Sequence, residues 1–345
     1  MNPEAVMMTV LREALSWKRP YGTRAEGRLV SYLARMVGQL RPDAESWVDT
    51  AGNLHVDTRP LRRNAVNQRT LFVAHVDTVH RSGGPNKFSD NKPMWEAAGG
   101  EPLGADDGAG VALMCGLIAG GIDAYFIFTR GEERGGHGAK HVVDFYPDML
   151  REFDRAIAVD RKDVFSVITH QFAGRCCSTA FADALSDELN TLGMMMMPDD
   201  TGVYTDTAEF MEHIPECTNI SAGYNREHTP QETLDTDYLK QLLAAMLQVK
   251  WENLPVERDP DDGDAEDDLK LMADMGGAPG WQAAYERWMK EDLMLREAET
   301  LEGFDPITNV PDRRALTAEE LIDMQNDPFA WSDDGRMVRY GSGRH

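Results

Sequence analysis

Hydrophobic residues along positions 1–250 alternate between helical spacing and short apolar runs. Apolar residues on one helical face predict helices at 5–17, 24–40, 107–121, 135–146, 177–193 and 234–254. Short runs rich in β-branched and aromatic residues predict strands at 53–58, 70–78, 124–130, 155–161, 162–170 and 216–223. Because helices alternate with strands, we expect an α/β fold of three layers, in which helices cover both faces of a mostly parallel central sheet.

The pattern changes near residue 256, where "VERDPDDGDAEDD" has the Pro, Gly and acid content of a linker. Two helical patches follow at 281–300 and 316–325, and Thr317 with Glu320 forms a capping box at the second. We therefore divide the chain into a domain at 1–255 and an acidic, partly helical C-terminal extension at 256–345. This extension could cover the domain, mediate assembly or bind a partner, and a solvated tail is the alternative.

Composition narrows the classes of function. The formal net charge is −24, which argues against nonspecific binding to nucleic acid. No apolar run approaches the roughly 18 residues of a membrane helix, and the N-terminal segment lacks the layout of a signal peptide. We therefore expect a cytoplasmic protein that contacts no membrane. The cysteines, which we expect to be buried free thiols, are Cys115, Cys176, Cys177 and Cys217.

Histidine and acidic residues gather where the predicted strands end. They are His75 and Asp77 in the run at 70–78, Glu132 and Glu133 after 124–130, Asp160 in 155–161, and His228 after 216–223, with Asp106 and Asp107 at a helix start. In a parallel sheet such ends meet at one edge, where ligands collect. Crowded carboxylates repel one another unless a cation lies among them or some are protonated. Imidazole with carboxylate suits zinc, and also manganese or cobalt.

Each of these residues, taken alone, has a structural interpretation. His75 could be a buried histidine satisfied by hydrogen bonds, and Asp160 could cap a strand end. Asp107 is favoured as a helix-start acid over a role in supporting the site. The coincidence of all these residues at strand or helix ends favours a metal site.

Five segments in order resemble the zinc-dependent exopeptidase superfamily with paired metals, which includes bacterial zinc aminopeptidases and peptidase T. They are "HVDT" (75–78), "GADDGAG" (104–110), "GEERGGHGA" (131–139), "AVD" (158–160) and "TDTAEFMEHIPECTNISAGYNREHTPQETLD" (205–235), and "GNLHVD" (52–57) also fits. The resemblance implies a zinc-exopeptidase fold. It also implies two divalent ions, with zinc favoured over cobalt or manganese.

The resemblance implies a role for each matching residue. His75 and Asp160 would bind one ion, Glu133 and His228 the other, and Asp106 would bridge them. Asp77 would orient the His75 ring, and Glu132 would be the general base that takes a proton from a metal-bridged water. In many of these aminopeptidases a tyrosine near the last histidine steadies the oxyanion, and Tyr224 is the candidate here. The interval between Asp160 and His228 is too short for the inserted lid domain of peptidase T.

Three functions remain open at this point. The first is an aminopeptidase-like exopeptidase that cleaves terminal bonds of short peptides. The second is an amidase or deacylase of the same superfamily, acting on N-acyl amino acids or amino sugars. The third is a binding or assembly protein that keeps the fold without turnover. The C-terminal extension could also support homo-oligomers or bind a partner.

Overall fold

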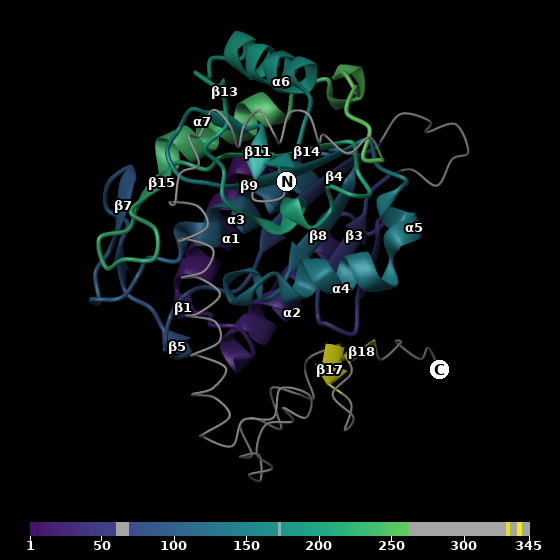
Figure 1. Cartoon of the computed structure of the whole chain (residues 1–345). Helices are drawn as coiled ribbons and strands as arrows, with labels where there is room; N and C mark the ends of the chain where they lie inside the picture. Colours follow the sequence, from purple (N-terminus) through teal and green to yellow (C-terminus); the bar gives the residue numbers. More distant parts are fainter. Residues whose placement is uncertain (60–68, 172–173, 262–328, 332–336, 340–345) are drawn as a thin grey trace, which may run out of the picture. The chain divides into compact units, whose positions relative to one another are not determined.

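A computed structural model describes residues 1–59, 69–171 and 174–261, together with 329–331 and 337–339 (Figure 1). The helices of this part are α1 Pro3–Leu15, α2 Arg24–Leu40, α3 Ala105–Ala119, α4 His137–Phe145, α5 Pro147–Leu150, α6 Thr179–Thr191 and α7 Thr236–Met246. Three 3₁₀ turns are η1 Glu132–Arg134, η2 Asp206–Ala208 and η3 Trp251–Asn253. The first helices lie close to their predicted positions, and α2 starts where the Thr23 side chain accepts a hydrogen bond from the Glu26 N–H.

The central sheet has the strand order β13-β10-β14-β9-β4-β8-β3-β2. Its strands are β2 Glu45–Val48, β3 Leu54–Asp57, β4 Thr70–His75, β8 Tyr125–Thr129, β9 Arg155–Arg161, β10 Ser166–Ile168, β13 Met197–Asp199 and β14 Glu216–Ser221. The four central strands, β14, β9, β4 and β8, are mutually parallel, whereas β2, β3 and β10 join through antiparallel pairs. The sheet is therefore mixed around a parallel centre, and the predicted α/β class is confirmed.

Smaller strand pairs lie outside the central sheet. They are β1 Trp17–Lys18 with β5 Gly84–Pro85, β11 His170–Gln171 with β12 Gly174–Arg175, and a sheet of β15 Tyr224–Asn225, β16 Thr233–Asp235, β7 Met94–Ala97 and β6 Phe88–Ser89. The sequence pattern did not predict β2 and β13 at the edges of the central sheet, and it missed the short strands β1, β5, β6, β7, β12, β15 and β16. The strand predicted at 162–170 is divided at Thr169 into β10 and β11.

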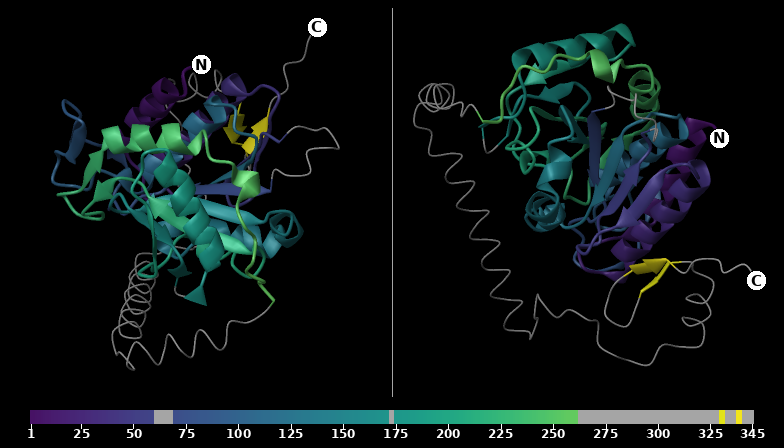
Figure 2. Two further views of the ribbon diagram at one scale, coloured as in Figure 1. Left: turned by 90° about the horizontal axis from the view of Figure 1, so that it is seen from above. Right: turned by 90° about the vertical axis from the view of Figure 1, so that its right-hand side faces the viewer.

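Helices cover both faces of the central sheet. Helix α3 packs against β4 and β9, and α1, α2 and α7 pack against α3. Figures 1 and 2 show α4 and α5 on the opposite face. This is the predicted three-layer arrangement.

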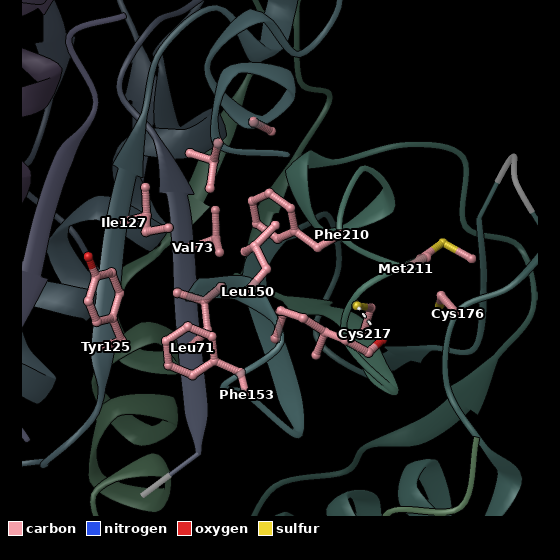
Figure 3. Packing of buried hydrophobic residues seen from close by; sticks show 14 of the residues in the cluster. Leu71, Val73, Tyr125, Ile127, Leu150, Phe153, Cys176, Phe210, Met211 and Cys217 are labelled. Atoms are coloured by element: carbon pink, nitrogen blue, oxygen red, sulfur yellow. Dashed lines mark hydrogen bonds between the residues drawn. The ribbon is translucent and has the colours of Figure 1, made fainter. Parts of the chain in front are cut away.

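The core between β4 and the α4–α5 face is apolar (Figure 3). Leu71 and Val73 are two positions apart in β4, so their side chains lie on the same face of the sheet. They face Leu150, Phe153 and Phe210, and all five side chains are fully or almost fully buried. Cys176 and Cys217 lie in the same cluster. All four cysteines are free and buried, as predicted.

The last helix is shorter than predicted. Helix α7 ends at Met246 rather than near residue 254, and Trp251 begins a 3₁₀ turn. The indole N–H of Trp251 donates to the Met246 carbonyl at 3.2 Å, and its ring packs edge-on against Phe72 at 5.1 Å between centres. The chain leaves the helix to bury this indole against β4, and apolar spacing alone could not distinguish that from another helical turn.

The chain divides into two compact units, Met1–Asp268 and Leu269–His345. Within the second unit, β17 Phe329–Trp331 pairs antiparallel with β18 Met337–Arg339. The helices predicted at 281–300 and 316–325 lie outside the described residues.

Candidate metal centre

The predicted ligands lie at adjacent strand ends. His75 is the last residue of β4, Asp160 is near the end of β9, and Glu133 follows β8 in η1. Because β8, β4 and β9 are adjacent and parallel, their carboxyl ends meet. Asp106 is in the first turn of α3, and His228 lies in the loop between β15 and β16. The structure therefore brings together residues that are far apart in the sequence.

The five side chains form two groups that share Asp106. His75, Asp106 and Asp160 form the first group, and Asp106, Glu133 and His228 form the second, with the ligand atoms of each group within 4.8 Å of one another. The Nε2 atom of His75 lies 3.1 Å from Asp106 Oδ1, and that of His228 lies 3.0 Å from Asp106 Oδ2. The two oxygens of one carboxylate therefore face the two groups.

The electrostatics of the first group favour a cation. The His75 ring has oxygen at both nitrogens, since Nδ1 lies 3.2 Å from the Asp77 carbonyl and Nε2 faces Asp106. Burial opposes a charge on this ring, but Asp160 and Asp106 outweigh burial and raise the pKa of His75 well above its usual value. A neutral imidazole carries one N–H, so a cation at Nε2 would satisfy the oxygens that the ring alone cannot.

The second group has the same character. Burial and the neighbouring Asp106 raise the pKa of Glu133 to about 7. The Oε1 atom of Glu133 is buried without a hydrogen bond, although His228 Nε2 is 3.1 Å away. Burial favours neutral Asp106, yet hydrogen bonds to His228 and His75 outweigh it and lower the pKa of Asp106. This donor set of imidazole nitrogen and carboxylate oxygen fits a pair of divalent ions.

Hydrogen bonds fix the Asp160 carboxylate. Thr205 Oγ1 donates to Oδ2 at 2.8 Å, and the Tyr224 hydroxyl donates to Oδ1 at 3.0 Å. The Asn219 side chain accepts from the Asp160 N–H and donates to its carbonyl. Tyr224 is thus buried beside a predicted ligand, and its hydroxyl holds that ligand in this arrangement. Its predicted oxyanion role stays a prediction.

Glu132 lies beside both groups and belongs to neither of them. Its Oε2 atom is 3.9 Å from His75 Nε2. Burial raises the pKa of Glu132 well above its usual value, and the attraction of His75 does not offset burial and the repulsion of Asp160. The two neighbouring glutamates therefore occupy different places, with Glu133 inside a ligand group and Glu132 next to it.

Asp77 contacts the glutamate loop more closely than the sequence indicated. Strand β4 ends at His75, so Asp77 lies beyond the strand on which it was expected. Its Oδ1 atom accepts hydrogen bonds from the N–H groups of Gly131 at 2.7 Å and Glu132 at 3.2 Å, and Oδ2 accepts from Glu133 at 3.3 Å. Its carboxylate is 3.5 Å from His75 Nδ1, which is closer to the Asp77 backbone carbonyl. Asp77 therefore holds the loop that carries both glutamates.

Asn53 holds the same loop from its two ends, a role that no sequence pattern predicted. Its Oδ1 atom accepts from the Arg130 N–H at 3.0 Å, and its Nδ2 atom donates to the Gly138 carbonyl at 3.0 Å. The buried Asp49 carboxylate accepts a further bond from Nδ2 at 2.7 Å. The only sequence signal for Asn53 is its place in the "GNLHVD" segment.

Asp107 and Asp206 complete the buried acids around the centre. Asp107 accepts from the N–H groups of His75 at 3.2 Å and Gly110 at 2.9 Å, so it does more than begin a helix. Asp206 is buried and accepts a hydrogen bond from the Thr129 hydroxyl. Burial raises the pKa of Asp206 to about 7. Both residues belong to neither ligand group.

The comparisons with known proteins show the fold. No family model and no curated protein sequence matches the chain. Among solved structures it is similar to the aminopeptidase PepT from Bacillus cereus, with a TM-score of 0.61 and 15% identity over 72% of this chain and 98% of that one. A tripeptidase from Staphylococcus aureus has a TM-score of 0.58 and 15% identity, covering 71% and 96%.

The Pyrococcus horikoshii TET1 peptidase, which can assemble into a tetrahedron or a large octahedral shell, has a TM-score of 0.54 and 16% identity over 70% and 98%. At these identities the similarity shows fold alone. The chain has the fold of these peptidases, and the predicted fold is thereby confirmed. Within the described residues, no helix combines the length and apolar character that crossing a membrane requires.

Proposed function

We propose that the protein is a metal-dependent exopeptidase that removes terminal residues from short peptides. One observation carries the proposal: two ligand groups share Asp106, and Glu132 lies beside them without joining either. His75 and Asp160 would hold one ion, and Glu133 and His228 the other, with zinc favoured by the mixture of imidazole and carboxylate. The free, buried state of the four cysteines supports a reducing, cytoplasmic setting.

The chain's own residues would carry the proton transfers. When bound, the two ions supply Lewis acidity that polarises the scissile carbonyl and lowers the pKa of water. Glu132 accepts the proton of the attacking water and passes it to the departing amine. Asp77 keeps Glu132 within reach of the centre by binding the backbone of its loop.

Replacement of Glu132 tests this function. We expect Glu132→Gln to lower kcat by about 10²–10⁴-fold, because general-base catalysis contributes about that much, while two ions stay bound. A peptide library digested by the metal-loaded protein and read by mass spectrometry reports cleavage, and metal analysis after dialysis reports binding. The exposed Glu212 offers a matched control, and Glu212→Gln should change neither measurement.

The outcomes separate the competing functions. Cleavage of N-acyl amino acids with no cleavage of free peptides would favour an amidase or deacylase. A protein that binds two ions and cleaves neither class of substrate would favour the non-catalytic alternative. Full turnover by Glu132→Gln, with two ions present, would contradict the assigned base.

A further inference from the structure

The side chain of Glu232 contacts the backbone at the start of α3. In the sequence, Glu232 follows the predicted ligand His228 by four positions. Its side chain is 1% exposed. Its oxygens accept hydrogen bonds from three successive N–H groups, those of Gly104 at 3.0 Å, Ala105 at 2.8 Å and Asp106 at 3.1 Å. The carboxylate therefore binds the backbone of Asp106, the residue that both ligand groups share.

Several neighbours favour a charged carboxylate at this position, although burial and the repulsion of Asp106 outweigh them and raise the pKa of Glu232 to about 7. The three N–H groups belong to Gly104, the residue that caps α3, and to the first two residues of α3, where unpaired helix N–H groups favour an anion. The buried guanidinium of Arg19 attracts both Glu232 and Asp77. Arg19 donates from Nε to the Val76 carbonyl at 2.9 Å and from Nη2 to the Gly104 carbonyl at 3.3 Å. Arg19 thereby ties the segment after His75 to the turn before Asp106.

The two ligand groups depend on Glu232 to different degrees. His75 and Asp160 are at the ends of the central strands β4 and β9, which pair with each other over Thr70–Val73 and Arg155–Ala158. His228 lies in a loop, its side chain is 49% exposed, and its backbone has a φ of 62°. Glu232 is the last residue of this loop before β16. Its side chain binds the start of α3, and its carbonyl accepts a hydrogen bond from the Ala97 N–H at 3.2 Å. His228 thus takes its position relative to Asp106 through Glu232.

We propose that Glu232 is a positioning residue that sets the separation of His228 from Asp106 and thereby the affinity of the second ion. The inference depends on the proposed pair of metal ions. Glutamine at this position would present an N–H₂ group to backbone N–H groups, so it would lose at least one of the three bonds. The loop would move away from α3, and the group of Asp106, Glu133 and His228 would open, whereas His75 and Asp160 would keep their places at the ends of β4 and β9.

Calorimetric titration of the metal-stripped protein with Zn²⁺ tests the proposal. We expect the unaltered protein to bind two ions, and Glu232→Gln to bind one ion about as well and the other about 10–100-fold more weakly, the usual effect of removing a residue that supports a ligand. The visible spectrum of the Co²⁺-substituted protein should change for one ion and stay constant for the other. Glu232→Asp, which keeps the charge but shortens the side chain, should give a smaller loss.

A matched control separates positioning from loss of charge. Glu227 lies in the same loop and pairs with Lys162 at 2.8 Å, so Glu227→Gln removes an equal charge without touching α3. An equal loss in Glu227→Gln, or equal weakening of both ions in Glu232→Gln, would overturn the proposal. Unchanged binding of both ions would overturn it too. Failure of the unaltered protein to bind two ions would instead contradict the proposed function, so the two failures are distinguishable.

Discussion

At the scale of single residues, burial and hydrogen bonding set the charge that a side chain carries. His80 is almost fully buried, with Nδ1 at 2.8 Å from the Thr78 hydroxyl and Nε2 at 3.0 Å from the Pro102 carbonyl. A neutral ring that donates from Nε2 to Pro102 and accepts at Nδ1 satisfies both contacts. Burial lowers the pKa of His80 to about 4, and the carbonyl of Pro102 does not offset it.

This shift predicts a dependence of stability on pH. The unfolded chain binds a proton at His80 near its usual pKa of about 6.5, whereas the folded chain does so only near 4. The unfolded state therefore holds more protons in this window, so the contribution of His80 to stability is complete above about pH 6.5 and is lost as the pH falls toward 4. His80→Gln keeps a donor for Pro102 and removes the titration. Urea unfolding between pH 7 and 4 should show that the free energy of unfolding falls less on acidification for this variant than for the unaltered protein. An identical dependence on pH in the two proteins would contradict the assignment.

At the scale of elements, the candidate metal centre depends on side chains that bind the backbone of a neighbouring loop or turn. Asp77 and Asn53 hold the loop after β8, and Glu232 holds the start of α3. Strands β3, β4, β8, β9 and β14 could be predicted from the sequence, because each is a clear apolar run, and the motifs marked the histidine and acidic residues that the structure brings together. The contacts of Asn53 and Glu232 could not, because each joins segments far apart in the sequence and no periodic pattern marks them. The early end of α7 was missed for a similar reason, since burial of Trp251 depends on Phe72.

Gly138 shows how closely the loop after β8 is packed. A Cβ atom at this position would lie 2.7 Å from the Arg130 nitrogen and would collide with Asn53 Oδ1. We expect Gly138→Ala to displace the glutamate loop, with a loss of about 1–3 kcal/mol in unfolding free energy and at least tenfold lower kcat. Gly38, inside α2, has open space around it, so Gly38→Ala should be neutral or stabilise by up to about 1 kcal/mol. Urea unfolding and peptidase assays measure both effects, and equal behaviour of the two variants would argue against a packed loop.

At the scale of the molecule, residues 1–261 contain the central sheet and both ligand groups. The body extends past the predicted boundary at 255, because Arg258 donates to the carbonyls of Met211 and Pro215 at 3.0 and 2.9 Å. The N–H of Glu257 also donates to the buried Glu216 carboxylate at 2.8 Å. A domain limit drawn from composition alone therefore falls inside a structured segment.

Two shortened chains test this limit. A chain that ends at residue 261 should keep the thermal midpoint of the first compact unit and bind two ions. A chain that ends at residue 255 should unfold several degrees lower, because it loses the Arg258 and Glu257 hydrogen bonds, about 1–3 kcal/mol together. Calorimetry and metal analysis provide the measurements, with size-exclusion chromatography to follow any change in self-association. Loss of metal binding in the 261-residue chain would show that later residues complete the site.

The shared carboxylate of Asp106 has a consequence for how the protein would fill with metal. Since one side chain serves two neighbouring sites, the first cation to arrive alters the affinity for the second, and thermodynamic reciprocity requires the second to alter the first by the same factor. The protein with one ion bound then has its own free energy, which is not the mean of the free energies of the metal-free and two-ion forms. Calorimetric titration with Zn²⁺ should accordingly depart from the curve of two independent sites, and the size of the departure measures the coupling free energy between the two ions.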